Sequence, residues 1–256
     1  MSVEGKVVII TGGASGIGRF VAGTFAAAGA RLAIADVAPM DAVAEEVASA
    51  GAEVLTVPTD VRIEDDVESL MEEVHERYGR IDVLLNNAAI VTHFPGGGKT
   101  PWPRIRDMEE EFIDNVVRTN LIGVILCTKY VIPYMEAQGS GHIINIGQGA
   151  LKASTRTDNI GSAMYSMSKV AVRSFTNHVA AEEAEHNICI VSMGPGSGGG
   201  RYRGIWTEDI EEQYRSGMAP IESVGDRYVL AAEAPMELSG HQVVVVDGVL
   251  AIDPSE

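Results

Sequence analysis

Short apolar runs alternate with longer amphipathic segments along most of the chain. The apolar runs are rich in β-branched residues, which suits strands buried on both faces of a parallel sheet. Strands are predicted at residues 6–10, 31–36, 53–57, 81–85, 141–146, 188–193 and 241–246. Helices are predicted at residues 16–28, 40–50, 64–78, 108–137, 162–186 and 223–234. This alternation predicts an α/β fold with a doubly wound, mostly seven-stranded parallel sheet flanked by helices.

The periodicity of residues 64–78 is typical of an amphipathic helix that ends at Gly79. Its apolar residues share one face: Val67, Leu70, Met71 and Val74. The longer helix predicted at residues 108–137 is expected to bend near Gly123 or Pro133.

Three stretches rich in glycine, proline or polar residues break the alternation and are predicted to be loops. They cover residues 91–107, 147–161 and 194–217, with a short helical flap over 201–217. Loops over the crevice of such a fold choose the substrate. An apolar or ring-shaped substrate would suit Trp102, Tyr202 and Trp206, and a carboxylate would suit Arg104, Arg106, Arg201 and Arg203. Ordinary packing and solvated charge explain these residues at least as well.

No repeat or linker is evident, so residues 1–256 are expected to form one domain.

Composition and charge narrow the classes of function. The 256 residues are 46% hydrophobic, enough for a large core, and carry a formal net charge of −17 that opposes binding to nucleic acid or anionic membrane. No stretch approaches the roughly 18 apolar residues of a membrane span, and no signal peptide is recognisable. Cys127 and Cys189 are far apart and are interpreted as buried thiols. The histidines show no ligand-like clustering, so no metal is expected. We expect a cytoplasmic protein.

A glycine-rich turn lies between the first two predicted strands. It reads Thr11-Gly12-Gly13-Ala14-Ser15-Gly16-Ile17-Gly18, and a single acid, Asp36, ends the second strand. A pyrophosphate would bind the free N–H groups at the helix start, and Asp36 would accept hydrogen bonds from a ribose diol. Asp36 would repel the extra phosphate of NADP, and neither Ala35 nor Val37 offers a positive charge. NAD is therefore the predicted cofactor, although such a turn can also exist without a ligand.

Tyr165 and Lys169 are four residues apart and therefore share one face of a predicted helix. A phenol with its pKa near 10 is a poor acid–base catalyst at neutral pH, and a neighbouring cation lowers that pKa. Such pairs are common on helices and are often incidental. This one follows the fifth predicted strand, where it can face the crevice that holds the glycine turn.

Taken together, these motifs resemble the short-chain dehydrogenase/reductase family in its single-domain, Rossmann-fold form. The match extends over nearly the whole chain: Thr11 to Gly18, Asp60-Val61, Asn86-Asn87-Ala88-Ala89, Asn120, Tyr165 to Lys169, Pro195-Gly196 and Asp247-Gly248. The resemblance implies that Tyr165 is the general acid/base, that Lys169 lowers its pKa and holds the nicotinamide ribose, and that Asn120 supports a proton-relay water. It also implies the cofactor-binding residues: Thr11, Gly12, Ser15, Gly16, Ile17, Gly18, Asp36, Asp60, Val61, Asn87, Ala88, Ala89, Lys169, Pro195 and Gly196.

The chain departs from the family pattern at several positions. The place of the usual catalytic serine falls on Gln148, whose amide could polarise a carbonyl; Ser154 or Ser162 could instead supply the hydroxyl. Ala89 replaces the glycine of the usual NNAG motif, and Ser197 stands where a threonine often follows the Pro-Gly pair. Residues 220–240 are shorter than usual, which affects a common subunit interface, and a homotetramer or homodimer is expected.

The predicted function is NAD-dependent interconversion of a small-molecule secondary alcohol and a ketone, with Gln148 orienting the substrate oxygen. Two alternatives remain open. One is a non-catalytic or weakly active NAD-binding homologue, a sensor or scaffold, which the Gln148 substitution favours. The other is an NADP-linked carbonyl reductase, which Asp36 disfavours.

Overall fold

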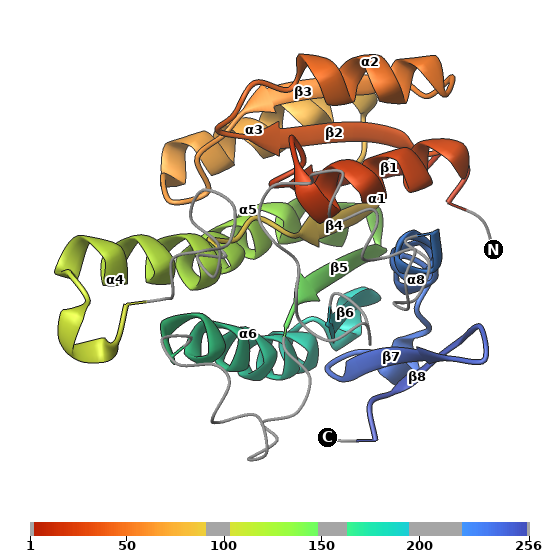
Figure 1. The fold of residues 1–256 in the computed structure, drawn as a ribbon. Helices are drawn as coiled ribbons and strands as arrows, with labels where there is room; N and C mark the ends of the chain where they lie inside the picture. The colour runs from red at the N-terminus through yellow and green to blue at the C-terminus, as the bar shows by residue number, and fades with distance from the viewer. Residues whose placement is uncertain (1–2, 91–102, 148–162, 195–221, 255–256) are drawn as a thin grey trace.

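In the computed structural model, residues 3–90, 103–147, 163–194 and 222–254 are described (Figure 1). Eight strands form one sheet in the order β3-β2-β1-β4-β5-β6-β7-β8. Their bounds are β1 Val7–Thr11, β2 Arg31–Asp36, β3 Val54–Pro58, β4 Val83–Asn86, β5 Gly141–Ile146, β6 Ile188–Met193, β7 Gln242–Val246 and β8 Val249–Ile252. Every pair from β3 to β7 is parallel, so the predicted doubly wound α/β fold is confirmed.

Helices cover both faces of the sheet. Their bounds are α1 Gly16–Ala27, α2 Asp41–Ser49, α3 Glu64–Tyr78, α4 Glu110–Val117, α5 Gly123–Gln138, α6 Ala163–Glu182 and α8 Glu222–Ala231. The core under α1, α2 and α8 includes Phe25, Val47 and Tyr228. The core under α3, α5 and α6 includes Leu70 and Val131. Alternate residues of each central strand enter opposite cores, which explains why the strands read as continuous apolar runs.

Four predicted elements match the structure residue for residue, namely β2, α3, β5 and β6. The others differ at their ends, where fraying and turn geometry decide the boundary. Of residues 162–186, predicted as one helix, Ala163–Glu182 form α6 and Ala184–His186 form a separate 3-10 turn, while residue 162 lies outside the described part of the chain. The stretch 103–107, within a predicted loop, carries a 3-10 turn at Ile105–Asp107.

The number of strands was predicted wrongly, because β8 was missed. Asp247 and Gly248 both have positive φ angles and turn the chain back, so β8 pairs antiparallel with β7. The residues of β8 are half-buried or exposed, and Val249 is 66% exposed. An edge strand of this kind lacks the long apolar run by which the central strands were recognised.

The long helix predicted at residues 108–137 is interrupted by a π-helical turn at Arg118–Ile122, between α4 and α5. The irregularity lies just before Gly123, one of the two positions expected to bend. Pro133 lies inside α5. Single π turns are frequent at functional sites, and this one contains Asn120.

By length and composition, Glu110–Gln138 could cross a membrane, with a mean hydropathy of 1.3 in its most apolar window. The expectation that no stretch is long and apolar enough was therefore wrong. The signal is weak, because core helices of soluble proteins pass the same test. Here Cys127, Val131 and Met135 of α5 belong to the sheet-facing core.

Candidate active site

The predicted cofactor residues gather at the carboxyl ends of β1, β2 and β4. The chain leaves β1 for β2 on one side and reaches β4 on the other, so the strand order reverses beside β1. Ligands of open α/β sheets bind in the crevice at such a switch point. Thr11 ends β1, Asp36 ends β2 and Asn86 ends β4.

The glycine turn is hydrogen-bonded to the segment after β4. The Thr11 hydroxyl donates to the Leu85 carbonyl at 3.3 Å and accepts from the backbone N–H groups of Asn87 and Ala88, each at 3.1 Å. The Asn87 side-chain amide donates to the carbonyls of Thr11 and Gly12, each at 3.0 Å. Two segments distant in sequence are therefore held together at the carboxyl ends of β1 and β4.

Two glycines allow this close approach. A Cβ on Gly12 would lie 2.7 Å from the Ala88 Cα, and Gly12 also has a φ of +67°. A Cβ on Gly18 would lie 2.2 Å from the Gly12 carbonyl oxygen. Side chains at either position would push the turn apart, so these glycines are required by packing as well as by the proposed ligand.

Asp36 is oriented by the glycine turn itself. Its Oδ2 accepts from the backbone N–H of Ala14 at 2.9 Å, and its Oδ1 accepts from that of Ala38 at 3.0 Å. A carboxylate oxygen can accept more than one hydrogen bond, so both remain able to bind a ribose diol. The Ser15 side chain forms no capping bond to α1, so this side chain does not compete for the first N–H groups of the helix. These features fit a dinucleotide.

The environment of Asp60 contains a residue that sequence reasoning missed. The Arg62 guanidinium donates to both carboxylate oxygens of Asp60, from Nη2 at 2.6 Å and from Nε at 2.9 and 3.0 Å. A fourth bond runs from Arg62 Nη1 to the Asn115 side-chain oxygen in α4 at 2.6 Å. The hydrogen bonds from Arg62 lower the pKa of Asp60. Val61 is buried and packs on Gly123, where a Cβ would lie 2.7 Å from Val61 Cγ2.

Tyr165 and Lys169 lie together in the first turns of α6. The Lys169 Nζ is 5.6 Å from the centroid of the Tyr165 ring, and Lys169 is only 1% exposed. Burial lowers the pKa of Lys169 to about 8 and raises the pKa of Tyr165 to about 12. The direction for Tyr165 is opposite to the predicted one, because removing the phenol from water disfavours the phenolate.

Asn120 connects α6 to the segment that follows β4. Its Oδ1 accepts from the Ile90 N–H at 2.7 Å, and its Nδ2 donates to the Ile90 carbonyl at 3.2 Å and to the Ser168 hydroxyl at 3.3 Å. The Ser168 hydroxyl in turn donates to the Tyr165 carbonyl at 2.7 Å. The structure thus brings Asn120, Tyr165 and Lys169 together, and Ser168 is a further link that the motif spacing did not indicate.

Several predicted residues lie outside the described part of the chain. They are Gln148, Pro195 and Gly196, together with Trp102, Ser154, Ser162, Ser197, Arg201, Tyr202, Arg203 and Trp206. Their predicted roles stay predictions. Arg104 and Arg106 are described and exposed, next to and within the 3-10 turn at Ile105–Asp107.

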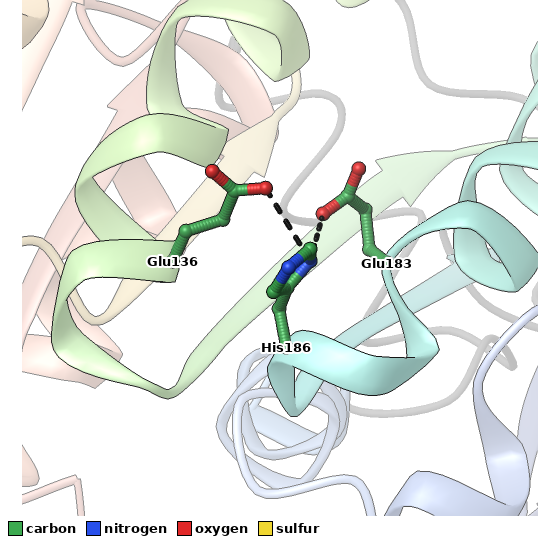
Figure 2. Close-up of side chains that lie close together, drawn as sticks. All are labelled: Glu136, Glu183 and His186. Atoms are coloured by element: carbon green, nitrogen blue, oxygen red, sulfur yellow. Dashed lines mark hydrogen bonds and ion pairs between the residues drawn. The ribbon is translucent and has the colours of Figure 1, made fainter.

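A cluster that the sequence did not indicate lies near the amino ends of β5 and β6, at the opposite end of the strands. His186 Nδ1 is 3.1 Å from a carboxylate oxygen of Glu183 and 3.3 Å from one of Glu136 (Figure 2). By ligand type these three side chains could hold a metal ion, so the statement that the histidines show no such clustering was wrong for His186. Glu136 lies in the last turn of α5, and the other two residues follow α6, away from Tyr165 at its start; the contacts of His186 Nδ1 with the two carboxylates account for the geometry.

Fold and site define a Rossmann-type α/β protein whose crevice suits a dinucleotide. A family model described as short chain dehydrogenase matches residues 6–202. The chain therefore belongs to the short-chain dehydrogenase/reductase family, as its motifs predicted, and is an oxidoreductase by membership of it.

Individual relatives differ in the reactions that their names describe. The 3-oxoacyl-acyl-carrier-protein reductase FabG of Thermotoga maritima is 35% identical over 198 residues, covering 77% of this chain and 75% of the relative. The cis-4-hydroxycyclohexanecarboxylate dehydrogenase of Sinomonas cyclohexanicum is 34% identical over 194 residues, covering 75% and 72%. A metagenomic short-chain oxidoreductase, solved in complex with NADP, superposes with a TM-score of 0.74 at 26% identity, covering 96% and 98%.

Proposed function

We propose that this protein is an NAD-dependent oxidoreductase that interconverts a secondary alcohol and a ketone, with Tyr165 as the general acid/base. The observation that carries the proposal is the hydrogen-bonded connection from the glycine turn, through Asn87 and the segment ending at Ile90, to Asn120 and the catalytic helix. It joins the glycine turn and the buried tyrosine–lysine pair in one hydrogen-bonded framework, which supports the proposal. Such a framework can hold reacting groups in the geometry that hydride transfer needs.

When bound, NAD would supply the hydride acceptor for alcohol oxidation, or NADH the donor for ketone reduction. Asp36 would bind its adenosine ribose, and Lys169 the ribose next to the nicotinamide. The protein's own contribution to the chemistry is the proton. With its pKa near 12, Tyr165 is protonated at neutral pH and suited to donate a proton to a ketone oxygen.

In the oxidation direction Tyr165 must first lose that proton. The Lys169 ammonium would stabilise the phenolate, and its lowered pKa of about 8 means that the amine itself can exchange a proton near neutral pH. The two side-chain N–H groups of Asn120 are already bonded, one to Ile90 and one to Ser168, so neither is left to bind a water. We therefore propose that the backbone carbonyl of Asn120 holds the relay water beside Lys169.

The cofactor assignment rests on Asp36, whose carboxylate is held at the mouth of the crevice by Ala14 and Ala38. A negative charge there would repel the 2′-phosphate of NADP. The NADP complex of a related structure supports the other candidate, an NADP-linked carbonyl reductase. Steady-state kinetics with both cofactors separate the two. A KM for NAD at least tenfold below that for NADP supports our proposal, and the reverse order supports the alternative.

Turnover should be followed at the NADH absorbance with cyclic alcohols, including cis-4-hydroxycyclohexanecarboxylate, and in reverse with 3-oxoacyl thioesters. The relatives named above motivate both choices. The Gln148→Ala and Gln148→Ser variants should be assayed with the same substrates as the wild type. A sharp loss in Gln148→Ala would support a role for the glutamine amide. No turnover of any substrate by the wild type, together with tight NAD binding, would favour a non-catalytic NAD-binding protein.

A further inference from the structure

Ser168 has a completely buried hydroxyl that is used twice. It is 0% exposed, it donates to the Tyr165 carbonyl one turn earlier in α6, and it accepts from the Asn120 amide in the π turn. A serine bonded back to its own helix alters the local backbone geometry. The bonds of Ser168 therefore act on the turn that presents Tyr165 and on Lys169, its neighbour in the chain.

The other end of this connection is equally constrained. The Asn120 amide has two N–H groups, one bonded to Ser168 and the other to Ile90, while its oxygen accepts from Ile90. Asn120 is itself 0% exposed. Removing the Ser168 hydroxyl would leave a buried N–H without this acceptor and release the Tyr165 carbonyl. A buried donor left unsatisfied is costly, so the local structure would rearrange.

Thr176 repeats the same chemistry two turns further along α6. Its hydroxyl is also completely buried, donates to the Val172 carbonyl at 2.9 Å and accepts from the side-chain amide of Asn145 at 2.9 Å. The difference is the partner, because Asn145 belongs to β5 in the middle of the sheet, whereas Asn120 belongs to the π turn. Thr176 therefore supplies an internal control for the loss of a buried hydroxyl.

We propose that Ser168 is a positioning residue, which sets Tyr165 and Lys169 relative to Asn120 and so adjusts the proton transfer of the reaction. This inference rests on the proposed function of Tyr165. The hydroxyl touches neither substrate nor cofactor in this role. It acts through two partners, the backbone carbonyl of Tyr165 and the side-chain amide of Asn120. The positions of these partners determine where the Tyr165 phenol and the Asn120 backbone carbonyl lie.

The test compares Ser168→Ala with Thr176→Val, since each removes one buried hydroxyl and keeps the rest of the side-chain volume. Both should lower the melting temperature. Only Ser168→Ala should lower kcat, by about tenfold, because small displacements of catalytic groups have large effects on rate. It should also move the midpoint of the pH profile of kcat by about half a unit, with the KM for NAD within about twofold of wild type. Equal kcat values and equal pH midpoints in the two variants would overturn the proposal.

A second readout does not depend on turnover. With tyrosine labelled at Cζ with ¹³C, Tyr165 is identified by the resonance that Tyr165→Phe removes. Its chemical shift is followed between about pH 7 and 10, where the neighbouring Lys169, with a pKa of about 8, changes its charge. The shift should differ from wild type in Ser168→Ala and not in Thr176→Val. An unchanged resonance in Ser168→Ala would refute the positioning role, even for a protein without turnover.

If Ser168→Ala does not fold, Ser168→Cys takes its place, because a thiol keeps a similar volume but is only a weak donor. The same comparison with Thr176→Val then decides. An inactive wild type would refute the proposed function alone, whereas an active wild type with an unchanged Ser168 variant would refute only the role of Ser168.

Discussion

The Asp36 carboxylate accepts a hydrogen bond from the backbone N–H of Ala14, with 2.9 Å between Oδ2 and N. An acid at the end of β2 is thereby tied to the glycine turn after β1. The bond fixes the direction in which the carboxylate faces before any ligand arrives. Such preorganisation reduces the entropy that binding must remove, and it makes the charge of Asp36 the feature to change first.

Asp36→Asn keeps an oxygen that can accept from Ala14 but removes the charge. We expect the KM for NAD to rise about tenfold and the preference for NAD over NADP to fall by about the same factor, equivalent to about 1.4 kcal/mol each. Steady-state kinetics with both cofactors measure this. Asp41→Asn, an exposed acid at the start of α2, is the matched control and should behave as wild type. A preference of the wild type for NADP would contradict the role given to Asp36.

Tyr165→Phe removes the proton donor and leaves the ring. A positioned acid or base contributes a factor of about 10²–10⁴ in rate, so turnover should fall by at least about 10²-fold. The dissociation constant for NAD should stay within about twofold of wild type, because the ring is kept. Fluorescence titration measures binding and the NADH absorbance measures turnover. Tyr130→Phe, which removes an exposed hydroxyl bonded to Glu64, is the control. Retained turnover in Tyr165→Phe would exclude Tyr165 as the acid/base.

Burial of Lys169 should make stability depend on pH in a definite direction. Its pKa is about 8 in the folded protein, against an ordinary value of 10.5 for lysine. Below about pH 8, Lys169 is charged in both the folded and the unfolded state, and the whole cost of burying the charge lowers the stability of the fold. Between about pH 8 and 10.5 the unfolded chain binds more protons than the folded one, so the free energy of unfolding rises with pH and this cost disappears. Lys169→Met should therefore be more stable than wild type at pH 7, by on the order of 3 kcal/mol.

The difference in the free energy of unfolding between Lys169→Met and wild type, from urea denaturation, should shrink toward zero by about pH 10.5. The opposite contributions of Tyr165 and of the buried Cys127 and Cys189, whose pKa values burial raises, occur in both proteins and largely cancel. The control is Lys129→Met at an exposed site. A difference that does not vary with pH would show that Lys169 titrates normally.

Gly18→Ala should disrupt the glycine turn. The new Cβ would lie 2.2 Å from the Gly12 carbonyl oxygen and 2.7 Å from the Asn87 amide nitrogen. Overpacking of this kind costs about 1–3 kcal/mol, and NAD affinity should fall as well. Gly23→Ala, in the same helix but with no atom within 4 Å of the new Cβ, should instead stabilise the protein by about 0.5–1 kcal/mol. Urea denaturation measures the stability of both variants, and NAD titration measures their affinity. Equal effects of the two substitutions would show that the turn around Gly18 has room for a Cβ.

Local patterns in the sequence determined most of the fold. The helix at residues 64–78 and the strands at 141–146 and 188–193 were predicted at their observed bounds, since amphipathic periodicity and long apolar runs are properties of neighbouring residues. The glycine turn, the acid that ends β2 and the spacing of Tyr165 and Lys169 are equally local. They sufficed to predict a dinucleotide crevice and the family.

Only the tertiary structure decided how those residues interact. The bonds of Asn120 to Ile90 and Ser168, and of Arg62 to Asn115, join segments whose distance in sequence gives no signal. The edge strand β8 depends on a partner strand and a turn rather than on its own apolar run. Burial likewise decides the direction of the Tyr165 pKa, because desolvation depends on every element packed around the phenol, and spacing along one helix shows only which cation lies near it.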